Sequence, residues 1–199
     1  MEKLLIATNN NGKVKELKEL LKNTGIELIT PFDIGLDLEV DEDGTTYAEN
    51  AIKKAVAFAH ASGLTSLADD SGVEVEALNG APGLFSKRYS PKLNASNADR
   101  RAYMLENLKG KPRPWKARFH ATIAIATSEK DVQVAEGNCY GEIIPEERGT
   151  GGFGYDAIFL LPELNKTMAE LEQEEKNRFS HRAKAVMNAI PILREIFQT

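Results

Sequence analysis

A glycine-rich stretch in the last third of the chain constrains the fold more strongly than any other part of the sequence. Gly149 to Gly154 holds four glycines in six positions, and the apolar run Ala157 to Leu161 follows it. Glycine has no Cβ, so such a run lets the backbone adopt positive φ or approach a ligand closely. The apolar run predicts a buried strand. The stretch is therefore either a glycine-rich hairpin or a flexible cradle for a flat, phosphorylated ligand.

Length and composition are those of an ordinary globular protein. The chain has 199 residues, 42% of them hydrophobic and 28% charged, so residues 1–199 can bury a substantial core as a single domain. The net charge of −5 argues against binding to nucleic acid or to an anionic membrane, because both need a basic surface. It does not exclude an anionic small ligand, because a divalent metal can offset local carboxylates.

Cysteine content and the N-terminal sequence indicate the cellular compartment. The single cysteine, Cys139, excludes an internal disulfide and fits a reducing cytosol. The N-terminal apolar run, Leu4 to Ala7, is too short for a signal peptide or a membrane span. We therefore expect a cytoplasmic protein.

A strand, a polar turn and a helix are expected in succession at the N-terminus. Lys3 to Thr8 is typical of a strand, Asn9 to Gly12 is typical of a turn, and apolar residues recur at helical spacing after Lys13. The N-terminus of a helix can bind a phosphate, and Lys13 would add a full positive charge. A Walker A loop is excluded, since Ala7 and Val14 stand where that motif needs Gly and Ser/Thr. The alternative is a plain strand–turn–helix with a surface lysine.

Two acidic stretches are candidates for a functional role. Asp37 to Asp43 carries five carboxylates in seven residues, which usually indicates a solvated loop but also suits Mg²⁺, because hard cations take oxygen ligands. Asp69-Asp70-Ser71-Gly72 follows the apolar strand Leu64 to Ala68 and is expected to form a turn. Ligands of α/β sheets bind outside the carboxyl ends of strands. One of the two aspartates could therefore face a ligand while the other pairs nearby.

The remaining chain predicts further helices and long strands. Helices are expected from the capping box at Thr46 to about Ala61 and over Ala98 to Leu108. Long strands are expected over 117–126 and 132–144. A last helix should bury one apolar stripe, formed by Ala183, Val186, Met187 and Ile190. The helix should end or kink at Pro191.

Six short motifs occur along nearly the whole chain. They are Ala-Thr-Asn-Asn-Asn-Gly-Lys (7–13), Glu-Asn-Ala-Ile-Lys-Lys-Ala (49–55), Ala-Asp-Asp-Ser-Gly (68–72), Gly-Ala-Pro-Gly (80–83), Gly-Thr-Gly-Gly-Phe-Gly-Tyr-Asp (149–156) and Glu-Glu-Lys-Asn-Arg-Phe-Ser-His-Arg (174–182). In order and spacing they resemble the inosine/xanthosine triphosphate pyrophosphatase family. The resemblance implies an elongated, mixed β-sheet of the α/β class, flanked by helices, with two lobes and a cleft between them. It also implies a homodimer.

The resemblance implies roles for individual residues. Asp70 would be the catalytic acid/base and a Mg²⁺ ligand, and Asp41, with Glu39 as the alternative, would be the second ligand. The substrate would be bound by Thr8, Asn9, Asn10, Asn11, Gly12, Lys13, Ser71, Phe153, Gly154, Tyr155, Asp156, Lys176, His181 and Arg182. Ala157 stands where the family commonly has proline, and Lys87 where it commonly has alanine. Both positions flank the implied contacts, so activity is still expected.

The implied reaction is hydrolysis of ITP, dITP or XTP to the nucleoside monophosphate and pyrophosphate. Water would attack the α phosphorus, Asp70 would help to hold metal and activate water, and Lys13 would screen the leaving pyrophosphate. The candidate base contacts are the donors Lys176, His181 and Arg182 and the aromatic rings of Phe153 and Tyr155.

Three other functions stay open. A Maf-like pyrophosphatase acting on modified pyrimidine nucleotides is the nearest alternative. A nucleotide-binding regulator without hydrolysis is disfavoured by the Asp69-Asp70 pair. A P-loop-like kinase or GTPase is disfavoured because the Walker A spacing fails.

Overall fold

The computed structural model describes residues 2–198, which divide into two compact units. Unit 1 holds residues 2–70, 121–137 and 182–198, and unit 2 holds residues 71–120 and 138–181. The chain therefore passes from one unit to the other four times, at the peptide bonds after residues 70, 120, 137 and 181. That residues 1–199 act as one functional domain stays a prediction.

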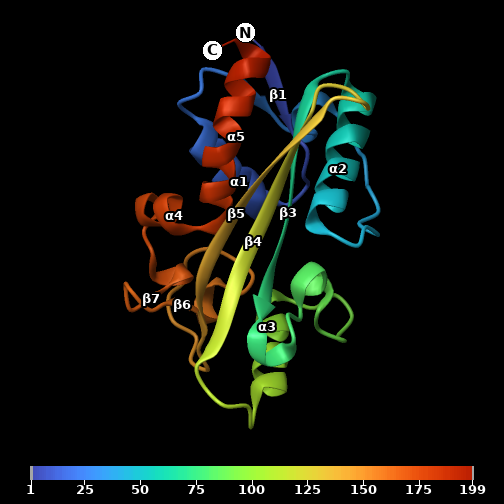
Figure 1. Cartoon of the computed structure of the whole chain (residues 1–199). Coiled ribbons are helices and arrows are strands. Elements are labelled where there is room, and N and C mark those ends of the chain that lie inside the picture. Colours follow the sequence, from blue (N-terminus) through green and yellow to red (C-terminus); the bar gives the residue numbers. More distant parts are fainter. Residues whose placement is uncertain (1, 199) are drawn as a thin grey trace. The chain divides into compact units, whose positions relative to one another are not determined.

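One mixed sheet contains all seven strands (Figure 1). The strands are β1 (Lys3–Ile6), β2 (Glu27–Ile29), β3 (Thr65–Val75), β4 (Trp115–Ala126), β5 (Val132–Ile143), β6 (Phe159–Leu161) and β7 (Lys166–Thr167). Their order is β2-β1-β3-β4-β5-β6-β7. β1 pairs in parallel with β2 and β3, whereas β6 pairs antiparallel with β5 and β7. The mixed, helix-flanked sheet that the resemblance implied is confirmed.

Five α-helices within the described residues accompany the sheet. They are α1 (Asn11–Leu21), α2 (Tyr47–Ser62), α3 (Asn97–Leu108), α4 (Gln173–Phe179) and α5 (His181–Phe197). The helices and long strands predicted from periodicity are present, with bounds shifted by a few residues. Among residues 2–198, no helix combines the length and apolar character that crossing a membrane would require.

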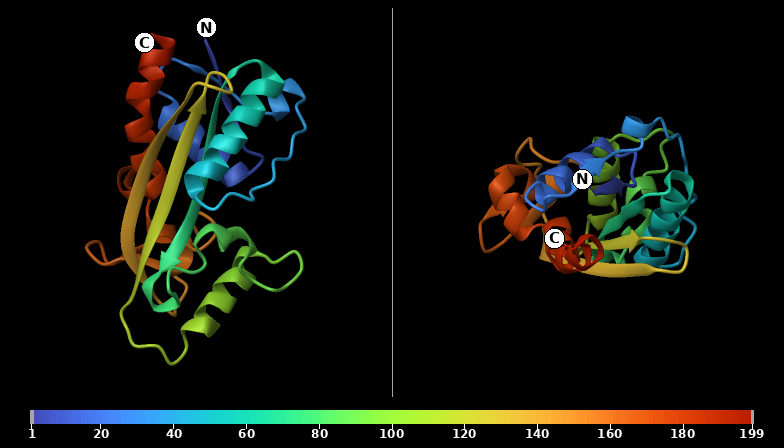
Figure 2. Two further views of the ribbon diagram at one scale, coloured as in Figure 1. Left: turned by 45° about the vertical axis from the view of Figure 1, so that its right-hand side comes forward. Right: turned by 90° about the horizontal axis from the view of Figure 1, so that it is seen from above.

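β1 and the first half of β3 bury both of their faces. Side chains alternate along a strand, so Leu4 and Ile6 pack with α1 and α5, while Leu5 and Ala7 pack with α2. Figures 1 and 2 show α5 and α2 on opposite sides of these strands. Two apolar layers therefore enclose β1 and the first half of β3.

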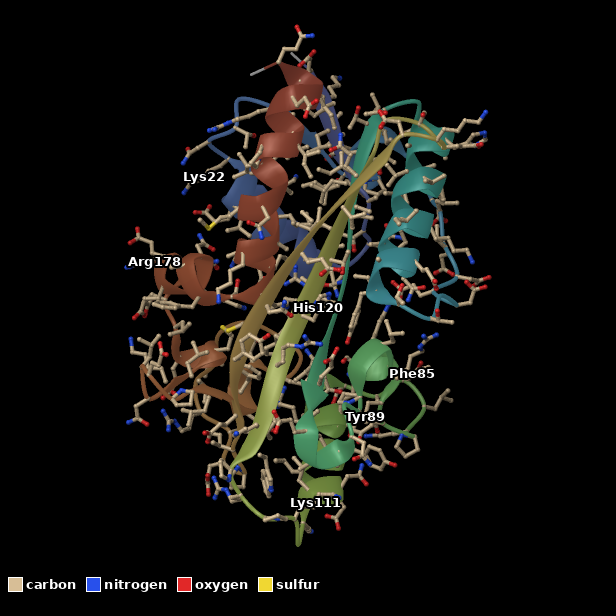
Figure 3. All side chains as sticks on the ribbon, viewed as in Figure 1. Lys22, Phe85, Tyr89, Lys111, His120 and Arg178 are labelled. Atoms are coloured by element: carbon tan, nitrogen blue, oxygen red, sulfur yellow. The ribbon has the colours of Figure 1, made fainter. Side chains whose placement is uncertain are left out.

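Unit 2 has a separate core rich in aromatic residues. Met104 and Leu108 of α3 are fully buried in it, and the rings of Phe119 and Phe159 lie 4.4 Å apart between centroids. On β4, the Nδ1 atom of His120, labelled in Figure 3, lies 2.8 Å from Asn138 Oδ1. This core fixes the segments that carry the glycine-rich stretch.

The predicted turn at Asp69–Gly72 is wrong. β3 runs unbroken from Thr65 to Val75, and Asp69 and Asp70 lie in the middle of it. A turn is unnecessary because buried cations compensate both carboxylates within the strand, as described below, and Ser86 Oγ accepts the Val73 N–H at 3.0 Å. Asp69 and Asp70 still point to opposite faces, since side chains alternate along a strand.

The prediction for the last helix is correct only in part. Pro191 lies inside α5, which continues to Phe197, so the proline does not end the helix. Met187 is 60% exposed and not in the buried stripe. The buried residues, including Ala189 and Leu193, pack into the core of unit 1 on both sides of Pro191, so packing holds the helix where one backbone hydrogen bond is lost.

Candidate active site

The turn between β1 and α1 is built by side chains that cap the helix. Asn10 is the N-cap residue, and its Oδ1 accepts the N–H groups of Gly12 (3.0 Å) and Lys13 (3.2 Å). Thr8 Oγ1 accepts the Asn10 N–H at 3.2 Å, while Asn9 donates to the Leu38 carbonyl. The helix therefore begins two residues before Lys13, and its positive end is fixed at the residues expected to hold phosphate.

Asp69 is the centre of a buried ion cluster in unit 1. Lys13 Nζ lies 3.0 Å from Asp69 Oδ1, and Arg182 approaches Oδ2 with Nε at 3.0 Å and Nη2 at 2.9 Å. The third guanidinium nitrogen, Nη1, lies 2.5 Å from Glu16 Oε2. Two cations and two anions thus compensate one another inside the unit, which buried charges require.

Electrostatics keep Asp69 ionised. Burial alone would raise its pKa, but the charges of Arg182, Lys13 and Lys54 outweigh burial and hold the pKa well below its usual range. For Lys13, burial outweighs the attraction of Asp69 and lowers the pKa. Asp69 is therefore a permanent anion that anchors cations, and it is unsuited to accept a proton near neutral pH.

Asp70 points to the other face of β3, where α2 supplies its partners. Asn50 Nδ2 donates to Asp70 Oδ2 at 3.2 Å, and Lys54 Nζ lies 3.6 Å from Oδ1. Burial raises the pKa of Asp70, although Lys54 and Lys13 oppose this effect. A carboxylate with a raised pKa beside a lysine is suited to proton transfer.

Two lysines converge on a single backbone carbonyl. Lys54 Nζ donates to the Asp69 carbonyl oxygen at 2.8 Å, and Lys13 Nζ approaches the same oxygen at 3.4 Å. Burial alone would lower the pKa of Lys54, but Asp70, Asp69 and Glu42 raise it. The two ammonium groups therefore lie close to the same backbone oxygen, and fixed ammonium groups are suited to stabilise the charge of phosphate groups.

The carboxylates around Asp70 fit a metal ion whose coordination shell is completed by the phosphates of the substrate. Among residues 2–198 there is no group of three or more His, Cys, Asp or Glu residues arranged to hold a metal ion. Mg²⁺ is usually held by one or two carboxylates together with substrate phosphates. Asp70 is one such carboxylate, and Glu42, whose Oε1 lies 2.6 Å from Lys54 Nζ, shares a lysine with it. The predicted ligands Asp41 and Glu39 are exposed.

The glycine-rich stretch of unit 2 positions a second cluster. The carboxylate of Asp156 accepts the Phe153 N–H at 3.0 Å and pairs with Lys176 Nζ at 2.8 Å. The same ammonium lies 5.6 Å from the centroid of the Phe153 ring. At Gly152, a Cβ would lie 2.0 Å from Asp156 Oδ2, so glycine is required there. Gly154 has φ of +62°.

Several expected substrate contacts are buried or have partners within the protein, and their contact with substrate stays a prediction. Tyr155 is buried in the core of unit 2 and donates its hydroxyl to the Ser86 carbonyl at 2.8 Å, so Phe153, which is half-buried, is the better stacking candidate. His181 stacks on Phe119 with centroids 4.6 Å apart. Arg182 is 2% exposed, with its guanidinium on Asp69 and Glu16. Ser71 is half-buried on β3.

The structure adds residues to which the sequence interpretation assigned no individual role. These are Glu16, Glu42, Asn50 and Lys54. Asn50 and Lys54 lie four residues apart and thus on one helix face, inside the motif 49–55. This spacing of two polar residues beside the alanines of the buried stripe could have indicated a role for Asn50 and Lys54. The sequence offers no comparable signal for Glu16 and Glu42.

Comparison with known proteins identifies the family. The Ham1 family model matches residues 4–192. The chain belongs to the Ham1 family. It is 48% identical over 198 residues to a dITP/XTP pyrophosphatase of Desulforamulus reducens, covering 98% of this chain and 97% of that one. It is 47% identical over 187 residues to a dITP/XTP pyrophosphatase of Thermus thermophilus, covering 92% and 88%.

A solved structure agrees with this assignment. The Ham1 protein of Coxiella burnetii superposes with a TM-score of 0.88 at 40% identity, over 98% of this chain and 100% of that one. The resemblance drawn from the six sequence motifs is thereby confirmed.

Asp69→Asn tests the ion cluster. The change leaves Arg182 and Lys13 without their counter-charge, so we expect the free energy of unfolding at pH 7 to fall by about 3–5 kcal/mol, measured by urea denaturation. The pKa of Asp69 is depressed on folding, so its contribution is complete above the unfolded value of about 3.9 and is lost as the pH falls towards the folded value.

The difference in the free energy of unfolding between wild type and Asp69→Asn should therefore stay constant above about pH 5 and shrink below about pH 4. Asp43→Asn is the control, because Asp43 pairs with Lys53 on the exposed surface, and it should leave stability nearly unchanged. A gap between wild type and Asp69→Asn that persists undiminished in strong acid would contradict the assignment.

Proposed function

We propose that this chain hydrolyses the deaminated purine nucleotides ITP, dITP and XTP to the nucleoside monophosphate and pyrophosphate, and so removes them from the nucleotide pool. The observation that carries the proposal is the placement of Asp70, with its raised pKa, beside Lys54 and near the Asp69 carbonyl that Lys13 also approaches. The names of the relatives, dITP/XTP pyrophosphatase, support the same reaction.

Lys13 and Lys54 bind the phosphate groups in this proposal. Both ammonium groups lie within reach of the Asp69 carbonyl, and the N-terminus of α1, which begins at Asn11, adds the partial charge of its backbone amides. Charge develops on the leaving pyrophosphate during cleavage, and fixed cations stabilise that charge. Thr8 to Gly12 complete the turn that receives the phosphates.

Asp70 is the proton acceptor for the water that attacks the α phosphorus. Burial raises its pKa towards the working pH, which favours general-base catalysis. Asn50 donates to one of its oxygens and thereby orients the carboxylate. Asp70 would also bind Mg²⁺, together with Asp41, with Glu39 or Glu42 as the alternative, and the bound ion would neutralise and orient the phosphates.

Residues of unit 2 recognise the base. Phe153 stacks on the ring, and Lys176, whose ammonium group pairs with Asp156 and carries N–H donors, donates to the 6-oxo group of hypoxanthine or xanthine. Adenine carries a donor at that position, and a site built for an acceptor can reject such an analogue by about 10⁴-fold. Ser71, Gly154 and His181 are further proposed contacts. Tyr155 and Arg182 would support the site from within their units.

We also propose that the protein is cytoplasmic and that two copies form a homodimer. The family resemblance supports the homodimer, and the single cysteine supports the cytoplasmic location.

A nucleotide panel tests the proposed reaction. With Mg²⁺, ITP, dITP and XTP should each yield monophosphate and pyrophosphate in equal amounts, resolved by anion-exchange chromatography, whereas ATP should react far more slowly. A preference for modified pyrimidine triphosphates would favour the Maf-like alternative, and binding without products would favour a regulator. Orthophosphate release with inosine diphosphate as an intermediate would contradict the proposal.

Asp70→Asn should separate catalysis from folding. The amide keeps the shape but cannot accept the proton, so we expect turnover of ITP to fall about a hundredfold or more. Burial disfavours the ionised form of Asp70, so the melting temperature should not fall, in contrast to Asp69→Asn. Equal losses of turnover at both positions, with both variants folded, would refute the division of roles.

Asp41→Asn and Glu42→Gln serve as matched variants for the second metal ligand. The variant at the true ligand should raise the Mg²⁺ concentration needed for half-maximal turnover, and the other should leave it unchanged. If neither variant changes this Mg²⁺ concentration, neither carboxylate is a metal ligand.

A further inference from the structure

Arg101 of α3 joins two segments of unit 2 that border the glycine-rich stretch. Its Nε and Nη2 each lie 2.8 Å from a different carboxylate oxygen of Glu147, and its Nη1 donates to the Gly154 carbonyl at 2.8 Å. The Arg101 side chain is 14% exposed, while Glu147 is 46% exposed. One guanidinium therefore contacts Glu147, which precedes the glycine-rich stretch, and Gly154, which is its last residue.

The Gly154 carbonyl lies within the turn that forms the base-recognition cluster. Phe153 and Asp156 bond to each other in both directions: the Phe153 N–H donates to the Asp156 carboxylate, and the Asp156 N–H donates to the Phe153 carbonyl. Gly154 is between them with φ of +62°. Holding its carbonyl fixes the orientation of the peptide plane between Gly154 and Tyr155, which lies inside this turn.

The start of the same stretch is anchored separately. Arg148 pairs with Glu170 at 2.8 Å, and the Gly151 N–H donates to the Ala169 carbonyl at 3.0 Å. At Gly149, a Cβ would lie 2.5 Å from the backbone of Ala169. The beginning of the stretch is thus set by the segment around Ala169, and Arg101 acts at its end.

The geometry of Arg101 is specific to arginine. A guanidinium presents its N–H donors in a rigid plane, so two of them can match a carboxylate while a third reaches elsewhere. Lysine carries a single point charge and cannot make all three contacts in fixed directions. The contact is therefore directional as well as electrostatic.

We propose that Arg101 is a positioning residue for base recognition, which holds the Gly154 carbonyl and Glu147 so that Phe153 and Asp156 keep the conformation that receives the purine. The inference rests on the proposed function, because it assigns base recognition to the cluster of Phe153, Asp156 and Lys176. Arg101 does not touch the reacting phosphates, whose proposed ligands are residues of unit 1.

Arg101→Ala and Arg101→Lys test the inference, with Arg100→Ala as the matched control. Arg100 precedes Arg101 on α3 and bonds to the Lys87 carbonyl and to Asn97. We expect Arg101→Ala to raise KM for ITP about tenfold, with kcat changed less than about twofold, the scale of losing one charge-assisted contact. Arg101→Lys should recover only part of the loss, and Arg100→Ala should behave as wild type.

Two further measurements exclude a merely structural role. Inhibition by pyrophosphate should be the same in wild type and Arg101→Ala, because pyrophosphate lacks a base. Hydrogen exchange of the amides of residues 150–156, measured by mass spectrometry without nucleotide, should be faster in Arg101→Ala and unchanged in Arg100→Ala. A fall in kcat with unchanged KM, or unaltered exchange, would overturn the inference.

Binding of inosine monophosphate separates this inference from the proposed reaction. If wild type failed to hydrolyse ITP, the reaction would be wrong. Calorimetric binding of inosine monophosphate that is weakened about tenfold by Arg101→Ala, and not by Arg100→Ala, would still support the positioning role. Equal binding by all three proteins would overturn it.

Discussion

The pairing of Asp69 with Arg182 and Lys13 is the interaction on which the structure of unit 1 depends. Removing a charge from water costs several kcal/mol per ion, so none of these groups could be buried alone. Their mutual compensation joins β3 to α1 and α5, with Glu16 as the fourth member. Segments from the beginning, middle and end of the chain are thereby fixed around one carboxylate.

This arrangement gives two adjacent aspartates different chemistry. Asp69 is held ionised by cations that outweigh its burial, whereas burial dominates at Asp70 and raises its pKa. Environments that move two carboxylate pKa values apart are typical of acid–base assignments in enzymes. The alternation of side chains along an uninterrupted strand is what separates the two environments, so the continuity of β3 is a requirement of the site.

Local patterns predicted much of the fold, and long-range pairing explains most of what they missed. Helical spacing and capping residues located α1 and α2 because those signals lie within one or two turns of chain. The role of Arg182 could not be predicted in this way, since its partner Asp69 is 113 residues away. Glu16 was missed because periodicity treats a charged residue as exposed. The burial of Tyr155 in the core of unit 2 was not foreseen, because an aromatic residue beside glycines gives no local sign of long-range packing; its contact with substrate stays a prediction.

The position of bond cleavage tests the account most directly. If Asp70 delivers water to the α phosphorus while Lys13 and Lys54 hold the departing phosphates, the oxygen of solvent must end in the nucleotide. Hydrolysis of ITP in ¹⁸O-labelled water, followed by mass spectrometry of both products, should place one labelled oxygen in inosine monophosphate and none in pyrophosphate. Label in the pyrophosphate would show attack on the β phosphorus and would contradict the roles assigned to these residues.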